Sequence, residues 1–164
     1  MIEIFPRIIN QSEVNVPGSK SYTHRLLIAS ALSDGICTLK NCLRSEDTLL
    51  TLEALRKMDV RIDDINTKIT VHGNKGSLKA CHEPVFLGNS GTSMRLLTGV
   101  AALGKGEYTL TGTSRMSERP IEDLLDGLSS LGVAARSVNN NGCPPVLIKG
   151  GIIKGCRIEL KCNL

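Results

Sequence analysis

The sequence predicts a layered α+β fold built from about two copies of one αβαββ unit. The first reason is an internal repeat: Arg25-Leu-Leu returns as Arg95-Leu-Leu, and Gly35-x-x-Thr38-Leu39 returns as Gly106-x-x-Thr109-Leu110. The offset between matching residues grows slowly along the chain, as small loop insertions in a duplicated sequence would produce. The second reason is that helix-period and strand-period segments follow the same order in both halves. An extra strand before the first helix would make each unit βαβαββ.

The first helix of each unit is predicted at 21–33 and at 91–103, in both cases after a loop that contains glycine. Both segments are apolar on nearly every side, which is typical of a buried helix. A short strand is expected after each of them, near 36–40 and near 107–111. Amphipathic helices would then cover one side of the sheet that these strands join.

The second helix of each unit is amphipathic. In the first unit it is expected to start at Ser45, with acidic residues in a first turn that favours negative charge. In the second unit Pro120 suits the first helical position, and Gly132 ends the helix. Its apolar residues recur with a 3.6-residue period at Ile121, Leu124, Leu125, Leu128 and Leu131. Two short strands are expected to close each unit, near 60–63 and 68–72, then near 133–137 and 146–149, with a turn at 139–142.

Composition excludes several classes of protein. The 164 residues are 41% hydrophobic and carry a net charge of +4, so the chain can bury a core and is not a disordered polyelectrolyte. Aromatic residues make up only 2%, which disfavours a nucleic-acid binder that stacks bases. No apolar run approaches the ~20 residues that cross a bilayer. Residues 1–7 do not resemble a secretory signal, so we expect a cytoplasmic protein without membrane or nucleic-acid partners.

The six cysteines are expected to be reduced thiols. They form no C-x-x-C pair, and no histidine stands beside them with zinc-type spacing. In a cytoplasmic chain of this size a disulfide framework is not needed to stabilise the core. We therefore expect no zinc site at these cysteines.

The loop before the first helix, Val16 to Arg25, is the first candidate site. Ser19 or Ser21 can cap the helix, whose first-turn amides and dipole attract anions. Lys20 adds an ammonium group, and Arg25 lies four residues after Ser21, so the two project from one side of the helix. A hydroxyl, an ammonium and a guanidinium together suit a phosphate or a carboxylate. The plainer interpretation is a capped helix with solvated basic residues.

The second candidate loop, Leu87 to Arg95, occupies the same place in the repeat. Gly91 and Arg95 reproduce the spacing of Ser21 and Arg25, and Gly91 would let a ligand approach the backbone closely because it has no Cβ. Asn89 could cap the helix or bind a ligand. Alone, this loop would be interpreted as a glycine-rich turn, and it lacks the Walker A pattern. Its equivalence to the first loop favours a pair of anion sites.

The segment from Thr113 to Pro120 is the third candidate. Arg115 and Arg119 flank Glu118, so a weak surface ion pair is one interpretation and a second anion clamp is the other. His24 lies among apolar helix residues and is expected to be structural.

These three segments, taken together, resemble one known family. Three motifs occur in the order found in the N-terminal part of 5-enolpyruvylshikimate-3-phosphate (EPSP) synthases. They are Pro17-Gly-Ser-Lys-Ser-x-x-x-Arg25, Leu87-Gly-Asn-Ser-Gly-Thr-x-x-Arg95 and Arg115-Met-x-x-Arg-Pro-Ile121. The motifs span nearly the whole chain. UDP-N-acetylglucosamine enolpyruvyl transferase is similar in fold, but the Lys-Ser-x-x-x-Arg pattern favours the shikimate enzyme.

The resemblance implies a reaction and the residues that serve it. The family transfers the enolpyruvyl group of phosphoenolpyruvate to the 5-hydroxyl of shikimate 3-phosphate and releases phosphate, in aromatic amino acid and chorismate biosynthesis. It requires no metal or organic cofactor. By motif match, Lys20 would be catalytic and touch both substrates, while Ser21 and Arg25 would bind shikimate 3-phosphate. The residues that would shape the phosphoenolpyruvate site are Asn89, Gly91, Thr92 and Arg115.

The chain also departs from the family pattern, because members of the family are much longer and have two lobes. We therefore expect an N-terminal fragment in which residues 1–19 form a strand segment that joins the other lobe. Residues 20–164 would form a partial first lobe, with repeat units at about 20–76 and 85–151. The missing C-terminal lobe is then an expected partner, the fragment alone is expected to be inactive, and an exposed apolar face could support a dimer.

A non-catalytic anion-binding domain and the sugar-nucleotide transferase remain alternatives. Ser90 and Leu96 stand where Ala and Pro are common in the family, which leaves glyphosate sensitivity open.

Overall fold

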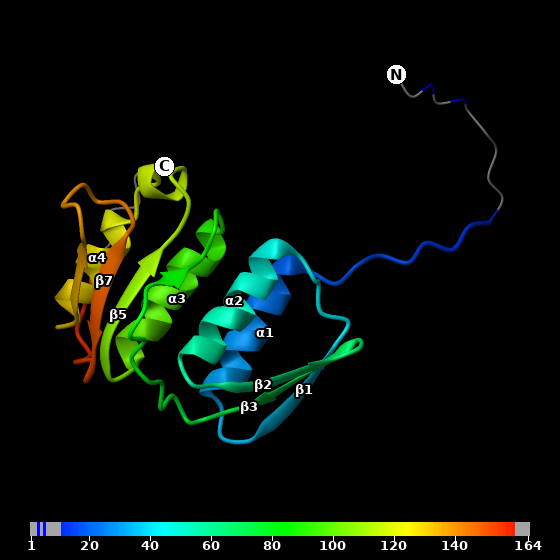
Figure 1. The fold of residues 1–164 in the computed structure, drawn as a ribbon, viewed down its shortest axis with the longest axis horizontal. Helices are drawn as coiled ribbons and strands as arrows, with labels where there is room; N and C mark the ends of the chain where they lie inside the picture. The colour runs from blue at the N-terminus through cyan, green and yellow to red at the C-terminus, as the bar shows by residue number, and fades with distance from the viewer. Residues whose placement is uncertain (1–2, 4, 6–10, 160–164) are drawn as a thin grey trace.

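The computed structural model of the chain describes residues 3, 5 and 11–159. Three helices, α1, α2 and α3, lie in the middle, with a three-stranded sheet beside α1 and α2 and a four-stranded sheet beside α3 (Figure 1). The α+β prediction is confirmed.

The first unit contains two helices and an antiparallel sheet. Its elements are α1 (Lys20–Leu32), β1 (Ile36–Lys40), α2 (Glu46–Lys57), β2 (Arg61–Ile65) and β3 (Lys68–His72). The strand order is β1-β3-β2, so the last strand of the unit lies between the other two.

The second unit repeats this order with one additional strand and one additional turn. Its elements are β4 (Val85–Phe86), α3 (Gly91–Leu103), β5 (Gly106–Thr111), the 3-10 turn η1 (Met116–Glu118), α4 (Glu122–Ser130), β6 (Ala134–Ser137) and β7 (Val146–Gly150). Strand β7 lies between β5 and β6 and is antiparallel to both, as β3 is to β1 and β2. Strand β4 adds to the other side of β5 in parallel. The repeated order of elements matches the prediction of two related units.

Capping residues explain where the helices begin and end. The Ser19 hydroxyl accepts a hydrogen bond from the Tyr22 amide at the start of α1. Ser45 and Thr48 form a reciprocal capping box at the start of α2, as the predicted start at Ser45 requires. Gly132 has a φ of +84° directly after α4, which confirms it as the residue that ends this helix.

Two predictions about the helices are wrong in part. Helix α1 is not buried all round, because Tyr22 is 71% exposed and Leu26 is 45% exposed. Pro120 is not the first helical residue: α4 begins at Glu122. The residue before a proline avoids the helical region, and Arg119 is extended with a ψ of 122°. Ile121 then stays outside the helix while its amide donates to the Gly142 carbonyl at 2.9 Å.

Of the extra strands predicted before each unit's first helix, the described residues contain β4 in the second unit. Residues 11–19 form no strand, and most of the earlier part of the predicted segment 1–19 lies outside the described residues. The proposed division of the chain into domains therefore stays a prediction.

The segment between the two units, residues 73–84, is attached to both. The Leu78 side chain is buried, and the Leu78 carbonyl accepts a hydrogen bond from the buried Tyr108 hydroxyl of β5 at 3.1 Å. The Lys79 amide donates to the carbonyl of Met58, directly after α2, at 3.1 Å. One continuous core of buried side chains runs through both units, including Leu27, Leu55, Leu97 and Leu110.

The cysteines of residues 11–159 are free thiols, as expected, and Cys162 lies outside the described residues. The described part of the chain contains no cluster of metal-binding side chains. None of its helices is both long and apolar enough to cross a bilayer.

Candidate functional site

The N-termini of α1 and α3 meet at a pocket of about 300 Å³. Each helix contributes its first turn and the residue one turn later, because the repeat gives both helices the same orientation toward the pocket. The lining residues are Lys20, Ser21, His24 and Arg25 from α1, and Gly91, Thr92, Arg95 and Leu96 from α3. No carboxylate is among them.

The backbone at both helix starts offers donors to an anion. The caps satisfy the amides of Tyr22 and Ser93, which donate to the hydroxyls of Ser19 and Ser90. The earlier first-turn amides of each helix have no acceptor within the helix. These amides and the positive ends of two helix dipoles favour negative charge in the pocket.

Three basic side chains surround the pocket and are held in different ways. The Lys20 ammonium forms an ion pair with Asp47 of α2 at 2.8 Å. The Arg25 guanidinium donates to the Ser21 hydroxyl and, at 3.2 Å, to the Ser21 carbonyl. Arg95 donates to the Pro120 carbonyl at 3.3 Å. Within residues 11–159, neither Arg25 nor Arg95 has a carboxylate within ion-pair distance. No neighbouring negative charge therefore competes with an anionic ligand for these two guanidinium groups.

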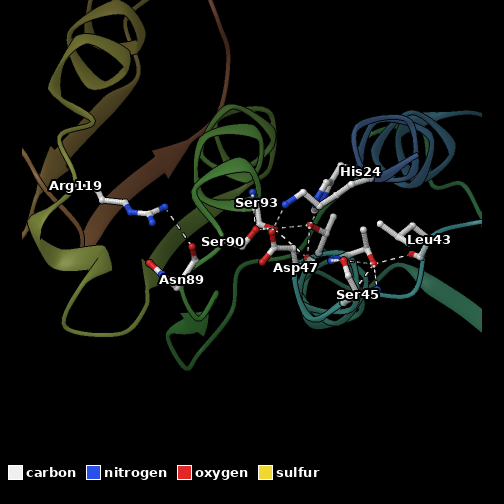
Figure 2. A network of polar contacts seen from close by, with 11 residues as sticks. His24, Leu43, Ser45, Asp47, Asn89, Ser90, Ser93 and Arg119 are labelled. Carbon is white, nitrogen blue, oxygen red and sulfur yellow. Dashed lines mark hydrogen bonds and ion pairs between the residues drawn. The ribbon is translucent and has the colours of Figure 1, made fainter. Parts of the chain in front are cut away.

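A second arginine reaches the start of α3 from the loop that precedes α4. Arg119 donates to the Asn89 carbonyl at 3.3 Å, as Figure 2 shows. A Cβ added to Gly91 would lie 3.0 Å from the Nη1 atom of Arg119 and 3.3 Å from that of Arg95. Two guanidinium groups therefore converge on the one residue of the pocket that has no side chain.

The structure brings five of the seven predicted site residues together around this pocket: Lys20, Ser21, Arg25, Gly91 and Thr92. Asn89 precedes the capping residue Ser90 and contributes its carbonyl to Arg119 rather than a side chain to the pocket. Arg115 is exposed at the start of η1 and does not line the pocket. Glu118 forms no ion pair with Arg115 or Arg119, so the surface-pair interpretation is wrong.

Sequence reasoning missed Asp47 and gave His24 no role at the site. Arg95 and Arg119 stood in the candidate segments, and the repeat matched Arg95 to Arg25, but neither arginine was assigned to a substrate. The ion pair between Lys20 and Asp47 joins residues 27 positions apart and has no local pattern. His24 is buried as expected for a structural residue, yet it also stands among the residues that line the pocket.

Buried hydroxyl groups connect the three central helices directly behind the pocket. His24 Nδ1 of α1 lies 2.8 Å from Thr51 Oγ1 of α2, which lies 2.8 Å from Ser93 Oγ of α3. Ser93 Oγ is also 2.6 Å from Ser90 Oγ and donates to the Asp47 carbonyl at 3.2 Å. Figure 2 shows this network between the helices.

Burial lowers the pKa of His24 below its ordinary value of 6.5, and the nearby cations Lys20 and Arg25 act in the same direction. Asp47 opposes them but does not reverse the shift. The ring is therefore neutral at neutral pH. Within the described residues its Nε2 atom is buried and has no hydrogen-bond partner.

This shift predicts a loss of stability on mild acidification. Below pH 6.5 the unfolded chain binds a proton at His24 and the folded chain does not, so the free energy of unfolding falls until the folded pKa is reached. At pH 5.5 this contribution is at most about 1.4 kcal/mol. Urea unfolding at pH 7.5 and 5.5 measures it, and His24→Asn should lose less stability than the wild type. An equal loss in both proteins would contradict the prediction.

We expect Gly91→Ala to weaken anion binding without unfolding the protein. The new methyl group would push the ends of two flexible arginine side chains, so the free energy of unfolding should change by less than about 1 kcal/mol. The methyl group would occupy ligand space between them, which should raise the Kd of an anion that carries a phosphate or a carboxylate about tenfold. Calorimetric titration beside a thermal melt tests both parts. Unchanged affinity would show that no ligand approaches Gly91.

Other hollows on the surface do not offer the same chemistry. A hollow of about 380 Å³ lies at the turn between β2 and β3, where Asp63 and Lys68 both contribute to the lining. It has no helix N-terminus and no group of cations without partners. The smaller pocket between α1 and α3 is therefore the better candidate.

Comparison with known proteins identifies one family over nearly the whole chain. A family model described as EPSP synthase (3-phosphoshikimate 1-carboxyvinyltransferase) matches residues 9–163. The 3-phosphoshikimate 1-carboxyvinyltransferase of Methanothermobacter thermautotrophicus is 43% identical over 145 residues, which cover 88% of this chain and 34% of that protein. The corresponding protein of Shewanella denitrificans is 41% identical over 155 residues, covering 93% of this chain and 36% of that protein.

Solved structures give the same relationship at the level of the fold. The EPSP synthase from Acinetobacter baumannii superposes with a TM-score of 0.84 at 37% identity, covering 90% of this chain and 34% of that one. The chain thus spans about a third of the length of the relatives that it matches.

Proposed function

The chain belongs to the EPSP synthase family, and from this premise we propose that it supplies one wall of the substrate site of a 3-phosphoshikimate 1-carboxyvinyltransferase. The observation that carries the proposal is the pocket where two helix N-termini, a lysine and two arginines meet without a lining carboxylate. Both proposed substrates, shikimate 3-phosphate and phosphoenolpyruvate, carry a phosphate and a carboxylate. A pocket of this charge and geometry suits such ligands.

The two sides of the pocket would bind different substrates. On the α1 side, Ser21 and Arg25 would hold shikimate 3-phosphate, because a hydroxyl and a planar guanidinium one turn apart match a carboxylate and its neighbouring hydroxyls. On the α3 side, the backbone of Gly91 and Thr92 would approach phosphoenolpyruvate closely. Lys20 lines the same pocket and would reach both ligands once it leaves Asp47.

Arg115 and Asn89 have less direct roles in this proposal. Arg115 is exposed one residue before Met116, whose side chain is buried, so its guanidinium extends from a fixed point of the fold. Asn89 would keep Arg119 at the start of α3 through its carbonyl. Both would act at the edge of the phosphoenolpyruvate subsite.

The proposed reaction has two steps, an addition followed by an elimination. The 5-hydroxyl oxygen attacks C2 of phosphoenolpyruvate and loses its proton to a base, while the methylene carbon gains a proton. The resulting tetrahedral intermediate then loses phosphate from C2 and a proton from the methyl group. Lys20 and the helix N-termini would stabilise the phosphate and carboxylate charges in both steps.

We expect the chain by itself to bind these anions but not to turn them over. Neither candidate base among the described residues is available to the 5-hydroxyl. The Asp47 carboxylate is paired with Lys20, and the Nε2 atom of His24 is buried away from a ligand. The absence of acid–base catalysis should lower the rate by about 10³-fold or more relative to intact relatives. A coupled phosphate-release assay measures this rate. Turnover close to that of an intact relative would contradict the expectation.

A non-catalytic anion-binding domain is the second candidate function, and the lack of a lining carboxylate favours it. Titration with shikimate 3-phosphate, phosphoenolpyruvate and UDP-N-acetylglucosamine separates the possibilities. The proposed function predicts binding of the first two, with weaker binding by Lys20→Ala, and no binding of the sugar nucleotide. Equal affinity for all three anions would favour the non-catalytic domain.

A further inference from the structure

We propose that His24, Thr51 and Ser93 are positioning residues that fix the spacing of the two anion-binding helix N-termini. The proposal rests on the proposed function, because it assumes that both N-termini serve one substrate site. None of the three residues was among those expected to touch a ligand. Each comes from a different central helix, and each side chain is completely buried.

The geometry makes α2 the bridge between the two ligand-binding helices. Helix α2 packs against both α1 and α3. At the level of the pocket, its Thr51 hydroxyl lies 2.8 Å from His24 Nδ1 on one side and 2.8 Å from Ser93 Oγ on the other. Apolar contacts are not directional, whereas hydrogen bonds at this distance fix relative position to a few tenths of an ångström.

The unpartnered Nε2 atom of His24 sets the direction in which the hydrogen bonds of the network are donated. Because His24 Nε2 is buried without a partner, it is better left as an unprotonated acceptor than as an orphaned N–H donor. Nδ1 then carries the proton and donates to Thr51. The Thr51 hydroxyl then donates to Ser93 Oγ, and the single Ser93 hydroxyl proton goes to the Asp47 carbonyl, while Ser90 Oγ donates to Ser93 Oγ. The chain of donors thus runs from α1 through α2 to the first turn of α3.

Asp47 connects this network to the proposed catalytic side chain. Its main-chain carbonyl accepts the hydrogen bond from Ser93, while its carboxylate holds the Lys20 ammonium at 2.8 Å. One residue of α2 therefore touches both ligand-binding helices. A shift of α2 would move Lys20 and the start of α3 together.

Two isosteric substitutions at His24 test which ring nitrogen matters. The side-chain amide nitrogen of asparagine occupies the place of Nδ1, and that of glutamine occupies the place of Nε2. His24→Asn should therefore keep the contact with Thr51 and bind shikimate 3-phosphate within twofold of the wild type. His24→Gln and His24→Leu should raise the Kd at least fivefold. The reverse order of Asn and Gln would overturn the proposal.

Substitutions at Thr51 separate positioning from simple stability. Thr51→Val removes the hydroxyl with little change in shape, and Thr51→Ser keeps it. Leu52→Val is the matched control, because it trims a buried core side chain at the next position of α2. We expect Thr51→Val to raise the Kd for shikimate 3-phosphate at least fivefold, and the other two to change it less than twofold. An equal effect of Thr51→Val and Leu52→Val would overturn the proposal.

Nuclear magnetic resonance of the ligand-free protein distinguishes failure of this proposal from failure of the proposed function. We expect the His24 ring to carry its proton on Nδ1, and Thr51→Val to shift the amide resonances of Gly91 and Thr92. If the wild type binds neither substrate, the proposed function fails and these spectra alone decide the positioning role. A proton on Nε2, or unshifted loop amides in Thr51→Val, would overturn it.

Discussion

Arg25→Ala should weaken binding of shikimate 3-phosphate by about 100-fold. Arg25 lines the pocket, has no carboxylate within ion-pair distance in residues 11–159, and is held on the ligand side by the Ser21 hydroxyl. Its removal takes away two charge-assisted hydrogen bonds of about 1.5 kcal/mol each or more. Isothermal titration of the wild type and the variant measures the ratio of their Kd values.

The control for Arg25→Ala removes the same charge elsewhere. Arg61 lies on β2, is 73% exposed and contacts only Asp63 among the carboxylates, at 3.5 Å. Arg61→Ala should leave the Kd within about twofold, because Arg61 does not line the pocket and exposed charges are screened by salt. Equal weakening by both variants would mean that Arg25 contributes only general positive charge. No weakening by Arg25→Ala would remove the residue from the site.

Gly18→Ala should destabilise the whole N-terminal loop, with a decrease of about 3 kcal/mol in the free energy of unfolding. A Cβ at position 18 would lie 2.0 Å from the Asn41 carbonyl oxygen and 3.0 Å from the Leu43 amide nitrogen. Both atoms belong to the backbone, so a side-chain rotation cannot relieve the clash. Because Gly18 directly precedes the cap of α1, the displaced loop should also reduce anion affinity.

Gly99→Ala should increase the free energy of unfolding, in contrast to Gly18→Ala. Gly99 lies inside α3, and a Cβ there would meet no atom within 4 Å. Alanine is the better helix former, so the variant should gain up to about 1 kcal/mol. Urea unfolding of both variants beside the wild type tests the pair. A Gly18→Ala variant as stable as the wild type would show that the loop before α1 is not packed against residues 41–43.

Local patterns predicted the elements that depend on local physics. The segment 91–103 was predicted as a helix and is α3, because a capping serine and a run of apolar residues suffice to define it. The strands β1 and β3 also lie where they were predicted. The start of α4 was not predicted correctly, because it depends on a hydrogen bond between Ile121 and Gly142 that joins distant parts of the chain.

The residues of the candidate site also fall into those that local spacing predicts and those that only helix packing brings together. Lys20, Ser21 and Arg25 could be placed together from helical spacing, and the repeat placed Gly91 and Thr92 in an equivalent position. The reach of Arg119 to Asn89 and the pairing of Asp47 with Lys20 could not be predicted, because each joins residues that only the packing of helices brings together. His24 was interpreted as structural, and no sequence pattern showed that this residue also borders the pocket.

The segment that joins the two units is hydrogen-bonded to both of them. The Tyr108 hydroxyl of the second unit is bonded to the Leu78 carbonyl, and the next residue, Lys79, is bonded to the end of α2 in the first unit. Opening either unit would therefore strip hydrogen-bond partners from the other. We therefore expect the two repeats to unfold together in one transition.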